Sequence, residues 1–502
     1  MDVLHELITS LTVAEKSYFK RYASKLSDEN SSTNYIQLFD AIAAQEEYDE
    51  AKLKKKFAKE KFVKQFSVAK NYLYKTIIKA LRNFYEEANP QLQVKHLLLE
   101  LNLLMDKGIY EQAYKVIRKG IQLSEAYELF NDESEFLGKE LYLLMNNYRP
   151  ADEERTVDDV MNAQKKLNKR IENLLEYETL YQSQHRLITG NYQLRNETQQ
   201  EAADKIFNNP LVQHEENALS AQARYYYHYI RTLYFSVFDK RKEFLASSEK
   251  LSELCRVSKR YAELDLRSYM NALNLLLEAS FFNADWKLMK SALEELQQLS
   301  VSSERDKTAQ FVYHSRFALV YYDQIKDTRA KSKLIDDAWN TIRKLEKKIP
   351  YHIRISLLVT YSSALMEMGE YARALDWIDL FRNKKKDEEA RYDVQSILLT
   401  LQLIAHYELG NTLLVKNIVP NIARAIRNIG QQSQFEKVVL SFFNKLTSAK
   451  AINEKVFEET LSELDALKQG DILSRNRTTH DIFRVFIDSK KHGKKYHEAL
   501  GS

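Results

Sequence analysis

The chain has 502 residues with a formal net charge of +4, and only 10 of them are glycine and 5 are proline. So few helix breakers exclude a strand-rich fold with a turn every few residues, and we expect a nearly all-helical chain. Cys255 is the single cysteine, which excludes an internal disulfide framework and is typical of a reducing compartment.

No segment has the composition of a membrane span or a signal peptide. The most apolar window, residues 397–415, still contains Gln402, His406 and Glu408. The first residues include the acid Asp2, where a signal peptide would carry positive charge. The sequence therefore predicts a cytoplasmic protein that makes no membrane contact.

Residues 1–88 are expected to form an amino-terminal helical domain. Thr12 and Glu15 have the spacing of a capping box, in which each side chain bonds the backbone N–H of the other residue at a helix start. Helices are predicted over residues 12–26 and 35–44, from residue 49, and over residues 67–85.

The segment from residue 51 to residue 85 is strongly basic, with ten lysines and one arginine against the single acid Glu60. On its last helix Lys75, Lys79 and Arg82 share one face, opposite an apolar face. The helix pair here has a faint similarity to a helix-turn-helix, although the connection over residues 57–67 is longer than the usual turn. Two interpretations stay open, a solvated face and a nucleic-acid surface. The candidate nucleic-acid contacts are Lys70, Lys75, Lys79 and Arg82.

A helical hairpin is predicted over residues 97–123. Leu97, Leu101 and Leu104 recur at helical spacing, Gly108 breaks the run, and Ala113 begins a second apolar stripe. The cassette Gly-x-aromatic-x-x-Ala formed there occurs again at residues 369–374. Weaker copies of the junction follow one another at intervals of about 41 to 49 residues, and such an interval is typical of a helical repeat array. They fall at Tyr148, Gly190, Phe238, Ala284, Lys326 and Gly410.

At these residues the chain resembles the tetratricopeptide repeat family, whose helix pairs share this junction and a small residue one helix face later. Gly108, Tyr110, Ala113 and Gly120 match in one unit, and Gly369, Tyr371 and Ala374 match in the other. The resemblance covers about residues 90–448 and implies an all-α fold, a right-handed α-α superhelix of helical hairpins. The interval exceeds the family's 34 residues, so each helix is expected to be about one turn longer.

Residues 156–190 contain no helix breaker. Thr156 and Asp159 form a second capping box, and the apolar pattern then runs on to Gly190. Two interpretations stay open: a single helix of about 50 Å, or two helices joined by a turn without a sequence signal.

The resemblance also implies a binding groove, lined by positions about thirteen, ten and six residues before each junction. Asn271 and Asn274 are then expected to hydrogen-bond an extended peptide while Arg316 holds a carboxylate. The alternative is a solvated groove without a ligand. These positions lack the set of lysines and arginines with which chaperone-tail readers of this family clamp a carboxylate. The groove candidates are Tyr225, His228, Thr232, Asn271, Asn274, Glu278, Tyr313, Arg316, Ser356 and Ser363.

The run Arg-Tyr-Tyr-Tyr-His-Tyr-Ile-Arg at residues 224–231 places aromatic rings on every side of one helix. Tyrosines that pack and also hydrogen-bond suit either a helix–helix seam or a peptide groove. Core packing is the favoured interpretation, because aromatic stripes in helical repeats mostly pack.

The sequence predicts no catalytic residues, no cofactor and no metal. No two glycines are closer than eight residues, which excludes a phosphate-binding loop, a dinucleotide fingerprint and a nucleophile elbow. Cys255 has no recognisable histidine partner, and His96 with Glu100 is one pair, too few for a metal site.

Three regions are expected: a basic helical domain over residues 1–88, a repeat array over 89–448, and capping helices with a basic tail over 449–502. The leading hypothesis is a non-enzymatic scaffold that binds a protein or peptide in the groove of the array. The alternative is a regulator that binds nucleic acid through residues 1–88 while the array senses a peptide or partner. Self-association is left open.

Overall fold

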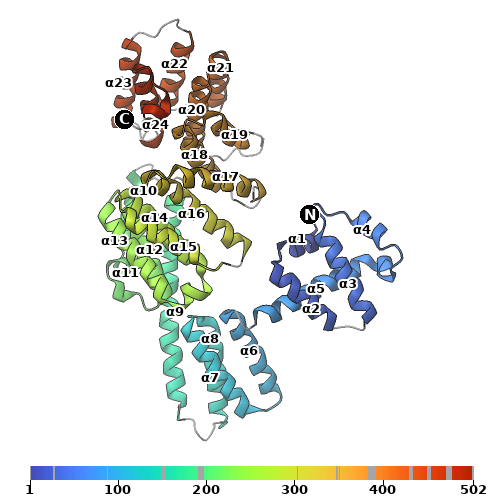
Figure 1. Cartoon of the computed structure of the whole chain (residues 1–502). Helices are drawn as coiled ribbons and strands as arrows, with labels where there is room; N and C mark the ends of the chain where they lie inside the picture. The colour runs from blue at the N-terminus through green and yellow to red at the C-terminus, as the bar shows by residue number, and fades with distance from the viewer. Residues whose placement is uncertain are drawn as a thin grey trace. The chain divides into compact units, whose positions relative to one another are not determined.

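All regular secondary structure in the described part of the chain is helical (Figure 1). The computed structural model describes residues 2–25, 29–86, 89–148, 154–189, 197–301, 303–345, 349, 351–382, 392–428, 434–448, 454–470 and 477–499. Within these ranges no strand occurs, which confirms the expected all-α class.

The amino-terminal residues fold as a bundle around their own apolar core, to which Phe19, Phe39 and Leu73 contribute. The predicted capping box is present, because the Thr12 N–H donates to Glu15 Oε2 at 2.6 Å and the Glu15 N–H donates to Thr12 Oγ1 at 3.3 Å. The helices are α1 (Val3–Ser10), α2 (Val13–Lys25), α3 (Glu29–Ala43), α4 (Glu50–Lys56), the 3-10 helix η1 (Lys61–Gln65) and α5 (Phe66–Tyr85).

The predicted hairpin at residues 97–123 is confirmed. Pro90 occupies the first turn of its first helix, where a missing N–H costs nothing, and Asn89 caps that helix by accepting the Leu92 N–H at 3.1 Å. The next helices of the chain pack on one another in sequence and share a core that includes Leu101, Ile117 and Phe136. They are α6 (Pro90–Asp106), α7 (Tyr110–Ala126), α8 (Phe130–Met145) and α9 (Val157–Thr189).

The predicted junctions share one backbone arrangement. At Gly108 the backbone has φ +72°, the Gly108 N–H donates to Met105 O at 3.1 Å, and the Ile109 N–H donates to Leu104 O at 3.0 Å. This pair of bonds around a left-handed residue ends a helix and satisfies two of its last carbonyls. The same arrangement recurs at Asn147, Asp239, Ala284, Lys326, Gly369 and Gly410.

These positions agree with the predicted breaks to within one residue, with Asn147 beside the expected Tyr148 and Asp239 beside the expected Phe238. The break expected at Gly190 lies outside the described residues. A left-handed backbone costs roughly 1 kcal/mol or more at a residue with a Cβ. Asn147, Asp239, Ala284 and Lys326 adopt this left-handed backbone despite that cost, so the junction has the same geometry at positions where the sequence has no glycine.

Residues 157–189 form one continuous helix, α9, of 33 residues. The Thr156 N–H donates to Asp159 Oδ2 at 2.9 Å and the Asp159 N–H donates to Thr156 Oγ1 at 3.2 Å, so the second capping box sets its start. Of the two interpretations of this segment, the single long helix is the one found.

Beyond α9 the chain continues as helices that pack on their neighbours in sequence, such as α16 on α17 and α18 on α19. The first of them are α10 (Glu197–Phe207), α11 (Pro210–Gln213), the 3-10 helix η2 (Glu215–Asn217), α12 (Ala221–Val237), α13 (Arg241–Val257), the π-helix η3 (Arg260–Leu264), α14 (Leu266–Phe282) and α15 (Trp286–Gln298). The last are α16 (Glu304–Gln324), α17 (Thr328–Leu345), α18 (Tyr351–Glu367), α19 (Tyr371–Arg382), α20 (Tyr392–Glu408), α21 (Thr412–Asn428), α22 (Gln434–Ser448), α23 (Glu454–Gly470), α24 (Arg477–Lys491) and α25 (Tyr496–Ala499).

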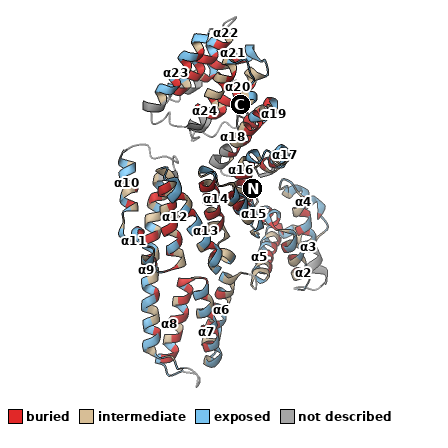
Figure 2. Cartoon of the chain, turned by 60° about the vertical axis from the view of Figure 1, so that its left-hand side comes forward, coloured by how far each residue is buried: buried red, intermediate tan, exposed pale blue. Residues whose placement is uncertain are grey.

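One apolar core extends from α16 to α25. Within it the Tyr361 ring stacks on Trp377 with their centroids 4.6 Å apart, and Trp339 meets Trp377 edge-on at 5.0 Å. Ala374 is fully buried in this core, as expected of the small residue that lets two helices approach closely. Figure 2 shows buried residues as stripes along helices whose remaining residues are exposed or intermediate.

The chain folds as two compact units. One comprises residues 1–179, 214–228 and 250–269, and the other comprises residues 180–213, 229–249 and 270–502. The division falls within α9, α12, α13 and α14.

One proline departs from expectation. Proline lacks a backbone N–H and disfavours helix before it, so prolines are expected at boundaries between helices, and Pro90 and Pro210 do begin helices. Pro420 instead lies inside α21. Its neighbours Val419 and Ile422 are buried while Pro420 itself is exposed. Burial of the apolar face outweighs the lost backbone hydrogen bond, and the unpaired carbonyl on the exposed face can be hydrated.

Candidate binding surfaces

Three groove candidates on α12 are buried. The Tyr225 hydroxyl donates to Ser268 O at 3.1 Å, and its ring stacks on Tyr261 with centroids 4.9 Å apart. The His228 ring lies 3.2 Å from a carboxylate oxygen of Glu215. Neither side chain is more than 5 % exposed. Their polar groups are used inside their own unit, which agrees with core packing for the aromatic run.

Thr232, the third of these candidates, is completely buried and donates its hydroxyl hydrogen bond to Ser247 Oγ at 2.9 Å. A polar side chain is tolerated at this buried position because Ser247 on α13 accepts its hydrogen bond. A ligand could reach it only if α12 and α13 separated.

The candidates on α14 and α16 are more accessible. The Tyr313 hydroxyl donates to Asn271 Oδ1 at 2.9 Å, so one of the two predicted asparagines joins the two helices. Asn274 lies one turn further along α14 and is half-buried. Its side-chain oxygen is enclosed and accepts no hydrogen bond from any residue that the structure describes.

Arg316 is one turn beyond Tyr313 on α16 and is exposed. Its guanidinium carbon lies 5.0 Å from the centre of the Phe317 ring, and no described acid forms an ion pair with it. Burial lowers the pKa of the neighbouring His314, so at neutral pH the positive charge on this turn belongs to Arg316.

The remaining groove candidates give less support for a ligand-binding groove. Glu278 is half-buried at the next turn of α14, and Ser363 is half-buried on α18. Ser356 belongs to α18, but its side chain lies outside the described residues.

Of the four candidate nucleic-acid contacts on α5, three are accessible. Lys75, Lys79 and Arg82 are exposed. Lys70 is not, because its ammonium donates to Asp2 Oδ2 at 2.8 Å, to Glu50 Oε2 at 2.8 Å and to the Tyr48 hydroxyl at 3.0 Å.

These bonds move the pKa values of the groups at Lys70. Hydrogen bonds from Lys54 and Lys70 lower the pKa of Glu50 to about 2. Burial opposes the charged form of Lys70, but its bonds to Asp2 and Glu50 outweigh that effect and raise its pKa. Lys70 is therefore a charged internal bridge between α5, α4 and the start of α1.

Exposed apolar side chains on α6 and on α8 are not anticipated from the sequence. Leu99 and Leu103 on α6 are 52 % and 57 % exposed, and Tyr142 and Met145 on α8 are 52 % and 68 % exposed. An ion pair between Lys95 and Asp132 joins the two helices. The spacing of Leu99 and Leu103 does place them on one face of a helix, but leucines at such spacing are normally assigned to a core and not to an exposed surface.

In the described part of the chain, no group of histidine, cysteine, aspartate and glutamate residues could hold a metal ion. Cys255 is buried, and His96 pairs with Glu86 at 3.1 Å and not with Glu100. A shallow depression of about 410 Å³ is lined by residues of α9 alone, Asn168, Ile171, Glu172, Leu175, Glu176 and Thr179.

None of the helices in the described ranges combines the length and the apolar character needed to cross a membrane. The fold and the surfaces together define a class: an all-helical chain of packed hairpins with polar, basic and apolar faces exposed. Comparison with protein families, with curated proteins and with solved structures finds no match to this chain.

Proposed function

We propose that this chain is a tetratricopeptide-like α-solenoid that binds a carboxylate-bearing peptide on α14 and α16 and acts without catalysis. The recurring junction supports the architecture, because Gly108, Asn147, Asp239, Ala284, Lys326, Gly369 and Gly410 close their helices with the same two backbone bonds. Helical arrays of this kind offer extended surfaces that commonly bind other proteins.

The observation that supports a ligand here is that two polar side chains, Asn274 and Arg316, have hydrogen-bonding groups without a partner among the described residues. The Tyr313–Asn271 hydrogen bond sets the register of α16 against α14. With one helix between them, we expect α14 and α16 to run in the same direction, which would place Asn274 beside Arg316 one turn further along. An enclosed amide oxygen without a donor costs about 1 to 3 kcal/mol. Turning the half-buried Asn274 side chain outward would let the N–H of a bound peptide recover that cost.

The chemistry of the pair favours a peptide with a carboxylate. A guanidinium offers two parallel N–H donors to a carboxylate, and Arg316 is held over the Phe317 ring without a competing acid among the described residues. Asn274 Oδ1 accepts a hydrogen bond, which a peptide N–H one or two residues from the carboxylate can donate. Glu278, at the next turn, excludes a second acidic side chain there by charge repulsion.

Selection from a display library of random peptides tests this function. Peptides enriched on the wild-type chain are synthesised with free and with esterified carboxylates, and their Kd values are measured by fluorescence anisotropy. We expect Arg316→Ala and esterification each to weaken binding at least tenfold, and Asn274→Ala to weaken it several-fold.

Arg329→Ala and Asn340→Ala serve as matched controls, because both side chains are exposed on α17. Their Kd values should equal that of the wild type. Peptides that bind wild type and Arg316→Ala equally, or a library from which no peptide is enriched, would contradict the proposed site.

A cytoplasmic location is part of the same proposal. Its support is the single cysteine, Cys255, whose thiol is buried and has no second cysteine in the chain to pair with.

A further inference from the structure

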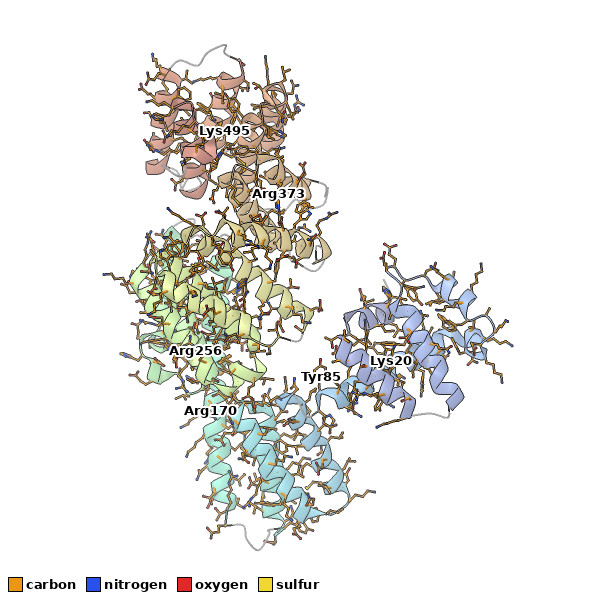
Figure 3. All side chains as sticks on the ribbon, in the orientation of Figure 1. Lys20, Tyr85, Arg170, Arg256, Arg373 and Lys495 are labelled. Carbon is orange, nitrogen blue, oxygen red and sulfur yellow. The ribbon has the colours of Figure 1, made fainter. Side chains whose placement is uncertain are left out.

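The amino-terminal bundle presents a dense set of exposed cations, and Glu60 is the one acid in the same stretch of chain, residues 51–85. Lys75, Lys79 and Arg82 occupy the exposed face of α5, and none of the three forms an ion pair within the described residues. The same holds for further exposed cations on α4, on the turn that follows it and on η1: Lys52, Lys55, Lys56, Lys59, Lys61 and Lys64. Figure 3 shows the side chains of this bundle, with Tyr85 labelled at the end of α5.

The acids of the bundle are largely occupied elsewhere. Asp2 and Glu50 bond Lys70, Asp40 pairs with Lys20 at 2.7 Å, and the buried Glu15 accepts a hydrogen bond from the Tyr85 hydroxyl at 2.6 Å. The exposed pair at residues 46 and 47 lies in the connection between α3 and α4. The face of α5 with Lys75, Lys79 and Arg82 therefore carries a positive field.

The Lys70 bridge ties this basic surface to the rest of the bundle. Its bonds to Asp2 and Glu50 tie the starts of α1 and α4 to the first half of α5. The apolar side of α5 is fixed as well, because Phe66, Leu73 and Ile77 are buried in the bundle core. A rigid array of charges loses less conformational entropy on binding than cations on a mobile segment.

We propose that the α5 face of this bundle binds double-stranded DNA. Lys75, Lys79 and Arg82 contact phosphates, and the first half of α5 lies against base edges. A helix of 20 residues is about 30 Å long, and the major groove admits an α-helix. The proposal is independent of the peptide site on α14 and α16, so either can fail without the other.

The exposed residues in the first half of α5 fit this role. Asn71 can bond an adenine, Ser67 can bond several bases, and Val68 offers methyl groups to thymine. Tyr72 is 45 % exposed with its ring held 4.6 Å from Tyr35. Small polar and apolar side chains beside a line of cations are what a helix in the major groove requires.

The test is a DNA titration of the full-length chain. Binding to a labelled 30-base-pair duplex is measured by fluorescence anisotropy at about 50 and about 200 mM salt, with a duplex RNA and a single-stranded RNA as further probes. We expect Lys75→Gln, Lys79→Gln and Arg82→Gln together to weaken duplex DNA binding at least tenfold. The salt slope should fall by about one to three units, since each phosphate contact contributes close to one.

A triple variant of the same charge change controls for net charge, and it combines Lys242→Gln, Lys250→Gln and Lys287→Gln at exposed positions outside the bundle. It should bind like the wild type. Lys70→Gln should lower the thermal stability while leaving the salt slope unchanged, because Lys70 positions the surface without contacting DNA.

Three outcomes would overturn the proposal: no salt-sensitive DNA binding by the wild type, equal losses in the two triple variants, or tighter binding of either RNA than of duplex DNA. Circular dichroism of each variant shows whether a loss of binding reflects unfolding. If the α5 triple variant unfolds, the single substitutions Lys75→Gln and Lys79→Gln replace it, and each should lower the salt slope by about one unit.

Discussion

Replacing Gly120 with alanine tests the close contact between α7 and α8. A Cβ added at Gly120 would lie 2.3 to 2.5 Å from three atoms of the Phe136 ring, far inside van der Waals contact. Phe136 is completely buried, so its ring cannot turn toward solvent. Overpacking of this kind costs about 1 to 3 kcal/mol, and the better helix propensity of alanine returns at most about 1 kcal/mol. With the full gain in helix propensity, we expect a net loss of up to about 2 kcal/mol.

Gly138 provides the matched control. It lies within α8, is exposed, and has no atom within 4 Å of an added Cβ. Gly138→Ala therefore gains helix propensity without a clash and should stabilise the chain by up to about 1 kcal/mol. The same chemical change is expected to have opposite signs at two positions on adjacent helices.

Urea unfolding followed by circular dichroism measures both changes in the free energy of unfolding. In a Phe136→Leu background the smaller side chain relieves the clash, so Gly120→Ala should cost less than in the wild type. A stabilising Gly120→Ala, or an equal cost in both backgrounds, would show that Gly120 does not limit the approach of these helices.

Two further predictions concern buried positions. Ala113→Tyr or Ala374→Tyr should destabilise the chain by about 1 to 3 kcal/mol or more, since both alanines are completely buried. An unchanged melting temperature for both variants would contradict the inference that the helices pack closely at these alanines. Burial raises the pKa of Glu133 from 4.5 to about 7, so the folded state binds its proton more tightly and stability falls as pH rises between these values. Glu133→Gln should abolish that fall and stabilise the chain by roughly 1 to 3 kcal/mol at pH 8; parallel urea midpoints for wild type and variant from pH 5 to pH 8 would contradict it.

Local sequence determines those features whose partners lie within a few residues. The capping boxes at Thr12 and Thr156 set helix starts, because both hydrogen-bonding groups sit in the same turn. The breaks at Gly108 and Gly369 are equally local, since a left-handed residue closes two bonds to the helix it ends. The helical class, the hairpins and most junction positions could therefore be predicted.

The candidate sites could be predicted only in part. The exposed cations Lys75, Lys79 and Arg82 follow from helical periodicity, which separates an apolar face from a charged one. Lys70 belongs to the same helix, yet Asp2 and Glu50 occupy it from elsewhere in the chain. Periodicity gives the direction of a side chain and does not give its partner.

Tertiary packing decided the remaining features. It buried Tyr225, His228 and Thr232 at positions that the tetratricopeptide resemblance assigns to a groove, left the oxygen of Asn274 without a donor among the described residues, and kept Pro420 inside a helix. Each outcome depends on side chains distant in sequence that compete for the same space or the same hydrogen bond. Such competition is resolved only when the helices are assembled, because the competing groups come from segments that are far apart in the sequence.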